Sequence, residues 1–202
     1  MIAILAFGFI YACAAACGII AAHLICSRVP QLEDAPAPAN LHPAIPVALF
    51  AFLGTMLAGS GAGIKELGLV ALMGVPLVGA WYSDALKGIV PDAFTLIPLA
   101  VVAVATIIQH SWGIALSVAV IFVAFAASAW LSKGRGMGWG DAKLAALCGA
   151  VLGLPIGLLT LAAACFAATV ISVVRDRGTK PIAFAPYIVI CVFAAILLTA
   201  RG

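Results

Sequence analysis

Long apolar runs, separated by short polar segments, dominate the pattern of this 202-residue chain. Most of the runs approach the ~20 residues that an α-helix needs to cross the hydrocarbon core of a bilayer. The pattern therefore predicts an all-α fold, a polytopic bundle of about eight transmembrane helices. The expected helices cover Ile2–Ser27, Pro43–Gly59, Leu67–Ser83, Ala93–Gln109, Gly113–Ser132, Ala142–Gly153, Pro155–Val174 and Ala183–Thr199.

The sixth run, Ala142–Gly153, is the shortest, and Gly153-Leu154-Pro155 predicts a break directly after it. If one long helix covered 142–174 instead, the chain would cross the membrane seven times, and a half-helix is a further alternative. Cytoplasmic loops carry an excess of Lys and Arg, which discriminates between these counts. With the N-terminus outside, eight crossings leave eight of the ten basic residues inside, and seven crossings leave five. The charges therefore favour eight.

Composition supports a membrane protein, because 66% of the residues are hydrophobic and only 8% are charged, against roughly 25% charged in soluble domains. The lipid bilayer is therefore an expected partner. The net charge of +3 is small and dispersed, which argues against nucleic-acid binding.

We expect a single domain over residues 1–202, with a proline-rich cytoplasmic linker at 29–42. The three histidines, His23, His42 and His110, are scattered along the chain, so no metal site is expected.

Two aspartates carry the candidate chemistry. Asp141 stands at the start of the sixth run, directly after glycines at 136, 138 and 140, and Asp84 stands at the end of the third run. A carboxylate beside hydrocarbon is costly, which makes each a candidate functional residue. Eight crossings bring both to the cytoplasmic side. Two facing aspartates can hydrolyse a peptide bond, one activating water while its protonated partner polarises the carbonyl.

Each aspartate also has a structural alternative. Asp141 is placed to be the N-cap of a helix that begins at Ala142, and Asp84 could be a loop carboxylate paired with Lys87. Asp92 follows a proline at the start of the fourth run, where a carboxylate caps the helix and favours its dipole. It is also a candidate supporting residue of the site.

Three further residues beside Asp141 are candidates for substrate binding or support. Gly138 and Gly140 would let the backbone approach a substrate strand closely. Lys143 would bias the charge of Asp141 or hold a substrate carboxylate, and its alternative is an anchor at the inner membrane surface.

These segments resemble the bacterial type IV prepilin peptidases, membrane aspartic proteases of the G-x-G-D class. Asp84 leads to Val90-Pro91-Asp92 and then Thr95-Leu96, similar to the first family motif. The run from Gly136 through Leu144 resembles the second motif, G-M-G-x-G-D-x-K-L. Phe184-Ala185-Pro186-Tyr187 is similar to a late F-G-P segment, with Ala185 in place of Gly.

The resemblance implies an aspartic endopeptidase with Asp84 and Asp141 as the catalytic pair and no cofactor for proteolysis. Its substrates would be prepilins or pseudopilins of a type IV pilus or type II secretion system, cut at the cytoplasmic face of the inner membrane. Larger family members carry two C-x-x-C pairs after the first helix, whereas Gln31–Leu41 has no cysteine. Some members also N-methylate the new N-terminus with S-adenosylmethionine, and the missing region leaves that activity open here. Neither the oligomeric state nor the particular pilin is indicated.

Three other classes of protein are alternatives. An ion- or proton-coupled transporter would use Asp84 and Asp141 as relay or binding groups, and would place them near the bilayer midplane. An assembly scaffold would have no use for two aspartates in these settings. A presenilin-type protease shares G-x-G-D, but it would bury both aspartates within helices and lacks the Pro91-Asp92 continuation.

Overall fold

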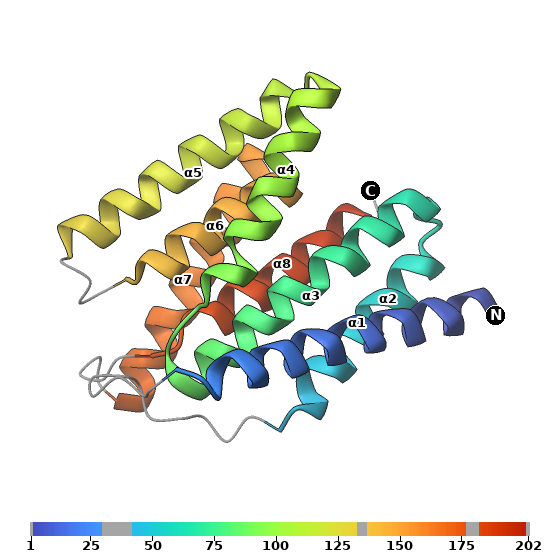
Figure 1. Ribbon diagram of the computed structural model, residues 1–202, viewed down its shortest axis with the longest axis horizontal. Helices are drawn as coiled ribbons and strands as arrows, with labels where there is room; N and C mark the ends of the chain where they lie inside the picture. The colour runs from blue at the N-terminus through green and yellow to red at the C-terminus, as the bar shows by residue number, and fades with distance from the viewer. Residues whose placement is uncertain (1, 30–41, 133–136, 177–181, 201–202) are drawn as a thin grey trace.

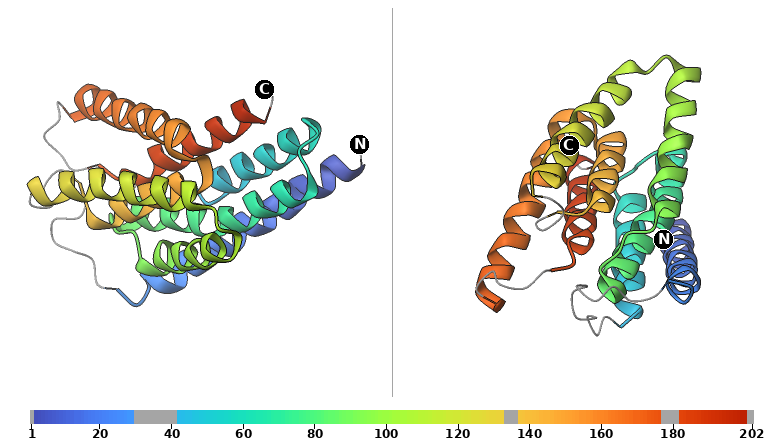
Figure 2. Two further views of the ribbon diagram at one scale, coloured as in Figure 1. Left: turned by 90° about the horizontal axis from the view of Figure 1, so that it is seen from above. Right: turned by 60° about the vertical axis from the view of Figure 1, so that its left-hand side comes forward.

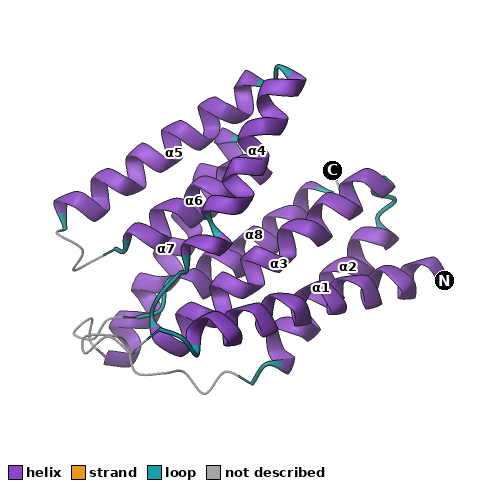
Figure 3. Ribbon diagram, in the orientation of Figure 1, coloured by secondary structure: helices purple, strands orange, loops and turns teal. Residues whose placement is uncertain are grey.

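A computed structural model describes residues 2–29, 42–132, 137–176 and 182–200 of the chain. The described part consists of helices joined by loops and contains no strand (Figure 3), so the all-α prediction is confirmed. Nearly all of the predicted linker at 29–42 lies outside the described residues. The helices are α1 (Ile2–Cys26), α2 (Ala44–Gly59), α3 (Ile64–Lys87), the 3₁₀ turn η1 (Asp92–Phe94), α4 (Leu96–Gln109), α5 (Trp112–Leu131), α6 (Trp139–Leu152), α7 (Leu154–Asp176) and α8 (Ala185–Thr199).

The helices pack side by side in a bundle (Figure 1). Helix α1 lies against α2 and α3, α5 lies against α6, and α8 contacts α3, α6 and α7. The start of α1 and the end of α8 lie at the same end of the bundle (Figures 1 and 2). The end of α3 and the starts of α6 and α8 meet at the opposite end. Three segments far apart in the sequence therefore come together away from the termini.

Five of the described helices are long and apolar enough to cross a membrane: Ile2–Cys26, Ile64–Lys87, Asp92–Gln109, Trp112–Leu131 and Leu154–Arg175. The apolar helices α2 and α8 are shorter. Large apolar side chains such as Phe9, Ile108 and Phe166 point outward, as expected of a surface that faces lipid. The chain is a multi-pass membrane protein. Helix α6 has only 14 residues, a length of about 21 Å against ~30 Å of hydrocarbon.

Aromatic packing joins the first three helices to α8. The ring of Phe50 lies between those of Tyr11 and Phe193, with centroids 4.8 and 5.0 Å away. The buried hydroxyl of Tyr11 donates a hydrogen bond to the carbonyl of Leu67 at 2.8 Å, so its polar atom has a partner in the apolar interior. The rings thus connect α1, α2 and α8, and the hydrogen bond connects α1 to α3.

Several helix boundaries differ from the predicted ones. Helix α3 covers Ile64–Lys87 rather than Leu67–Ser83, and α6 begins at Trp139 rather than Ala142. The fourth helix begins with the separate turn η1. The predicted break is confirmed, because α6 ends at Leu152, Gly153 adopts φ +74°, and α7 begins at once. Hydropathy underestimated the lengths of α3 and α6, because the candidate residues lie in polar turns at the end of α3 and at the start of α6.

Candidate active site

Asp84 lies inside α3, one turn before its end, and not in the loop that follows. Helix α3 stops at Gly88, whose φ of +65° is open to glycine and unfavourable for other residues. The N–H of Gly88 donates to the backbone carbonyl of Asp84 at 2.8 Å, which closes the last turn. The side chain of Asp84 is only 6% exposed, so its carboxyl group is held among protein atoms.

The first residue of α8 binds the Asp84 side chain. The backbone N–H of Ala185 donates to Asp84 Oδ2 at 2.8 Å, in a buried contact between residues 101 positions apart. The first N–H groups of a helix have no partner within the helix and carry its positive dipole end, so they suit a carboxylate. Sequence reasoning singled out Phe184–Tyr187 only by resemblance, and no local signal showed that it would reach Asp84.

Asp141 occupies the first turn of α6, where it is partly buried. Its Oδ2 accepts a hydrogen bond at 3.1 Å from the backbone N–H of Gly138, the N-cap residue of the helix. Asp84 and Asp141 lie close enough for their charges to repel each other. The structure therefore brings together two carboxyl groups that the sequence separates by two helices.

Gly140 connects the two motifs directly. A Cβ atom at this position would lie 2.9 Å from Val90 Cβ and 3.3 Å from the carbonyl oxygen of Val90. Only glycine allows the first turn of α6 to approach so closely the loop that follows α3. Gly138 is more open, with the Asp141 carboxylate as its nearest neighbour at 3.4 Å.

An ion pair forms a second connection between these segments. Lys143 Nζ lies 2.5 Å from Asp92 Oδ1, with the lysine side chain 24% exposed and the aspartate 62% exposed. Lys143 is thus paired with Asp92, a contact that sequence reasoning missed, because it assigned these residues to Asp141 and to the dipole of the fourth helix. Opposite charges were visible in the sequence, but nothing there indicated that they would meet.

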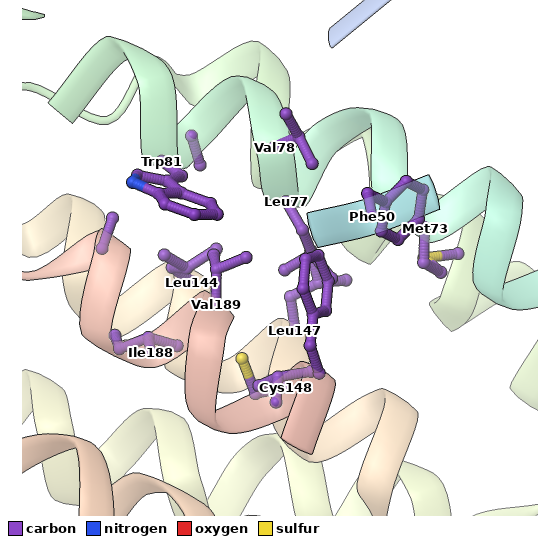
Figure 4. Packing of buried hydrophobic residues seen from close by; sticks show 14 of the residues in the cluster. Phe50, Met73, Leu77, Val78, Trp81, Leu144, Leu147, Cys148, Ile188 and Val189 are labelled. Atoms are coloured by element: carbon purple, nitrogen blue, oxygen red, sulfur yellow. The ribbon is translucent and has the colours of Figure 1, made fainter. Parts of the chain in front are cut away.

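Apolar packing beneath the carboxylates supports this geometry. Figure 4 shows Trp81 of α3 lying over Leu144 of α6 and Val189 of α8, with Ile188 alongside. The last three side chains are fully buried, and Trp81 is nearly so. Closely packed neighbours restrict side chains to few rotamers, which holds the three helix ends in register.

Both structural alternatives for the aspartates are wrong in detail. Asp84 is not a loop residue, and the ammonium group of Lys87 donates to the carbonyl of Val29. Asp141 is not the N-cap, because Gly138 holds that position. Both aspartates lie within helices, so this feature does not distinguish the chain from a presenilin-type protease, and the Pro91-Asp92 continuation must do so. Gly136 lies outside the described residues.

The arrangement suits hydrolysis by two carboxyl groups. Like charges at close range oppose each other's ionisation, so two neighbouring carboxyl groups can hold one proton between them. Within the described ranges, no group of three or more His, Cys, Asp or Glu side chains is arranged to hold a metal ion.

Comparison with known proteins gives one match. Residues 70–173 match the type IV leader peptidase family, a stretch that covers just over half of the chain. It includes both aspartates, the Val90 contact with Gly140 and the Asp92–Lys143 ion pair, but not the start of α8. Searches of curated proteins and of solved structures found no match.

Proposed function

Because the chain belongs to the type IV leader peptidase family, whose members are aspartic peptidases, we propose that it removes the leader peptide of prepilins or pseudopilins at the cytoplasmic face of the inner membrane. In this proposal Asp84 and Asp141 are the catalytic residues. Gly138, Gly140, Asp92 and Lys143 shape and support the site.

One observation carries the proposal. Two aspartates from different helices interact electrostatically at one end of the bundle, and each accepts a hydrogen bond from a backbone N–H at the start of a helix. Burying carboxyl groups together is unfavourable unless something offsets the cost. Such an arrangement is typical of catalytic sites.

In the mechanism, the ionised carboxylate takes a proton from a water molecule, whose oxygen forms a bond to the scissile carbonyl carbon. The protonated partner gives its proton to the carbonyl oxygen, which becomes a hydroxyl in the tetrahedral intermediate. When the C–N bond breaks, a proton passes to the departing nitrogen. The products are a leader with a new carboxyl terminus and a pilin with a new amino terminus, and no covalent enzyme intermediate forms.

The distribution of basic residues supports the proposed cytoplasmic side. Most of the basic residues fall in segments that eight crossings place inside, including Arg28 and Lys87 near the site end of the bundle. A site at this surface suits a substrate whose apolar stem lies in the bilayer while its charged leader stays in the cytosol. The transporter alternative requires carboxylates near the midplane, whereas Asp84 and Asp141 lie near helix ends.

The test is leader cleavage by the purified protein in lipid vesicles, with a prepilin-type substrate and the products weighed by mass spectrometry. We expect Asp84→Asn and Asp141→Asn each to lower kcat about 10⁴-fold or more, because members of a catalytic unit cannot substitute for one another.

A matched control is Glu66→Gln, which makes the same chemical change in an exposed carboxylate at the other end of α3. It should retain wild-type activity. Full cleavage by either dyad variant would refute the catalytic assignment.

The same assay with S-adenosylmethionine added would show whether the new N-terminus gains the mass of a methyl group.

A further inference from the structure

The carboxylate of Asp84 takes a partner from a helix that lies outside the matched family stretch of residues 70–173. That partner is the N–H of Ala185, 2.8 Å from Asp84 Oδ2. The backbone of Phe184 also faces the carboxylate. Pro186 follows and has no N–H to offer. The start of α8 therefore directs the N–H of Ala185 at the carboxylate of Asp84.

The surroundings of Asp84 otherwise oppose its ionisation. Burial removes water, and the Asp141 carboxylate on α6 repels a second negative charge. The carboxylate also lies near the C-terminal end of α3, where the helix dipole is negative. Cys165 of α7 faces Asp141 and brings no positive charge.

Among the described residues, each of the helices that carry the dyad has a basic residue close to its aspartate in the sequence, and both of these have other partners. Lys87, one turn further along α3, donates to the carbonyl of Val29. Lys143 of α6 is paired with Asp92. The positive end of α8 is thus the described feature that offsets the unfavourable setting of Asp84.

We propose that the N-terminus of α8 is a positioning element of the dyad, in which the Ala185 N–H holds the Asp84 carboxyl group in one orientation and offsets part of the cost of its negative charge. This inference rests on the proposed peptidase function. Ala185 is fully buried, and Ile188 and Val189 beside it are buried as well, so the N–H cannot turn toward water.

The experiment removes this N–H and nothing else. Lactic acid in place of Ala185 converts the amide to an ester of nearly the same shape, without the donor. The matched control is the same change at Ala44, also the first residue of a helix, whose N–H faces the His42 side chain and not the dyad. Ala185→Gly is a second control, because it keeps the N–H.

We expect the ester at 185 to lower kcat about tenfold to a hundredfold with KM unchanged, because a hydrogen bond to a charged group is lost. The acid limb of the pH profile should move to higher pH by about one unit, since the ionised dyad loses a stabilising contact. The ester at Ala44 should keep the wild-type kcat and pH profile. Ala185→Gly, which keeps the N–H, should keep the acid limb of the pH profile at its wild-type position.

Several results would overturn the inference. A wild-type kcat and pH profile in the ester variant, with Asp84→Asn inactive, would refute it and leave the proposed function standing. A change in KM alone would assign α8 to substrate binding instead. Activity in Asp84→Asn would refute both proposals. If the ester protein fails to insert, Ala185→Pro removes the same N–H at a helix position where proline is accepted, and the same criteria apply.

Discussion

Gly140 has no Cβ atom, and this allows the first turn of α6 to lie close to the loop that follows α3. The loop after α3 passes over the first turn of α6, and the nearest atoms to a side chain at 140 would be those of Val90. The backbone of this loop leads directly to Asp92, so the contact fixes the position of the whole second half of the first motif. Glycine is required here for closeness, since the residue lies in an ordinary helical turn.

Gly140→Ala should therefore reduce activity while leaving the protein inserted. The added methyl group would push Val90 away, and overpacking of this kind costs about 1–3 kcal/mol. We expect about a tenfold or greater loss of kcat in the leader-cleavage assay. Gly68→Ala is the matched control, because a Cβ there has no neighbour within 4 Å, and alanine should slightly stabilise helix α3. Equal activity of the two variants would show that the close approach is unimportant.

The elements that carry the site are joined by contacts between polar ends of helices. The ion pair of Asp92 with Lys143 ties η1 to α6 on the exposed side of the site, while Gly140 joins them on the inner side. These two contacts restrict both rotation and translation of α6 against the loop. In the described part of the chain, the hydrogen bonds to the dyad come from Gly138 and Ala185 and not from this pair, so we expect a supporting role.

A double-mutant cycle tests this role. Asp92→Asn and Lys143→Gln should each lower kcat less than tenfold, far less than the dyad variants. Because Asp92 is 62% exposed, the coupling between the two changes should be only about 0.2–1 kcal/mol, weakening at high salt. The measurement is kcat of both single variants and the double variant at two ionic strengths. Strict additivity would mean that the pair does not act as a unit, and a loss at Asp92 as large as at Asp84 would make Asp92 a catalytic residue.

At the scale of the molecule, hydropathy alone predicted the fold class and the order of the helices. The break at Gly153 was also predictable, since glycine and proline fall together after a short apolar run. The ends of α3 and the start of α6 were not, because these turns contain Lys, Glu, Ser, Asp and Gly, which a hydropathy pattern assigns to loops. A helix in a protein interior continues through polar residues where caps and tertiary contacts stabilise them.

The contacts made by the candidate residues were beyond prediction. Ala185 binds Asp84 across 101 positions, and Lys143 binds Asp92 across 51. Periodicity describes which face of a helix is apolar, but it carries no information on which distant polar group that helix end will meet. The sequence motifs indicated the candidate residues. Their contacts depend on how the helices pack, as at Trp81, Leu144 and Val189.

The orientation in the membrane remains a prediction that the proposed function depends on. In a cysteine-free background, Lys87→Cys and Arg135→Cys should be labelled by an impermeant thiol reagent only from the cytoplasmic side. His110→Cys, at the exposed turn between α4 and α5, should be labelled only from outside. Helices α4 and α5 form the hairpin between these positions, and the Lys and Arg residues at its base favour retention inside. Labelling of 87 and 135 from opposite sides would separate the aspartates by a bilayer and end the dyad hypothesis.

The bond between Ala185 and Asp84 also has a consequence for biosynthesis. Asp84 leaves the ribosome and enters the membrane about a hundred residues before its hydrogen-bond partner exists. Until α8 has been translated and inserted, a growing chain holds both aspartates but lacks the amide that we assign to orienting one of them. We therefore expect a chain that has not yet completed α8 to cleave its substrate more slowly than the finished protein does.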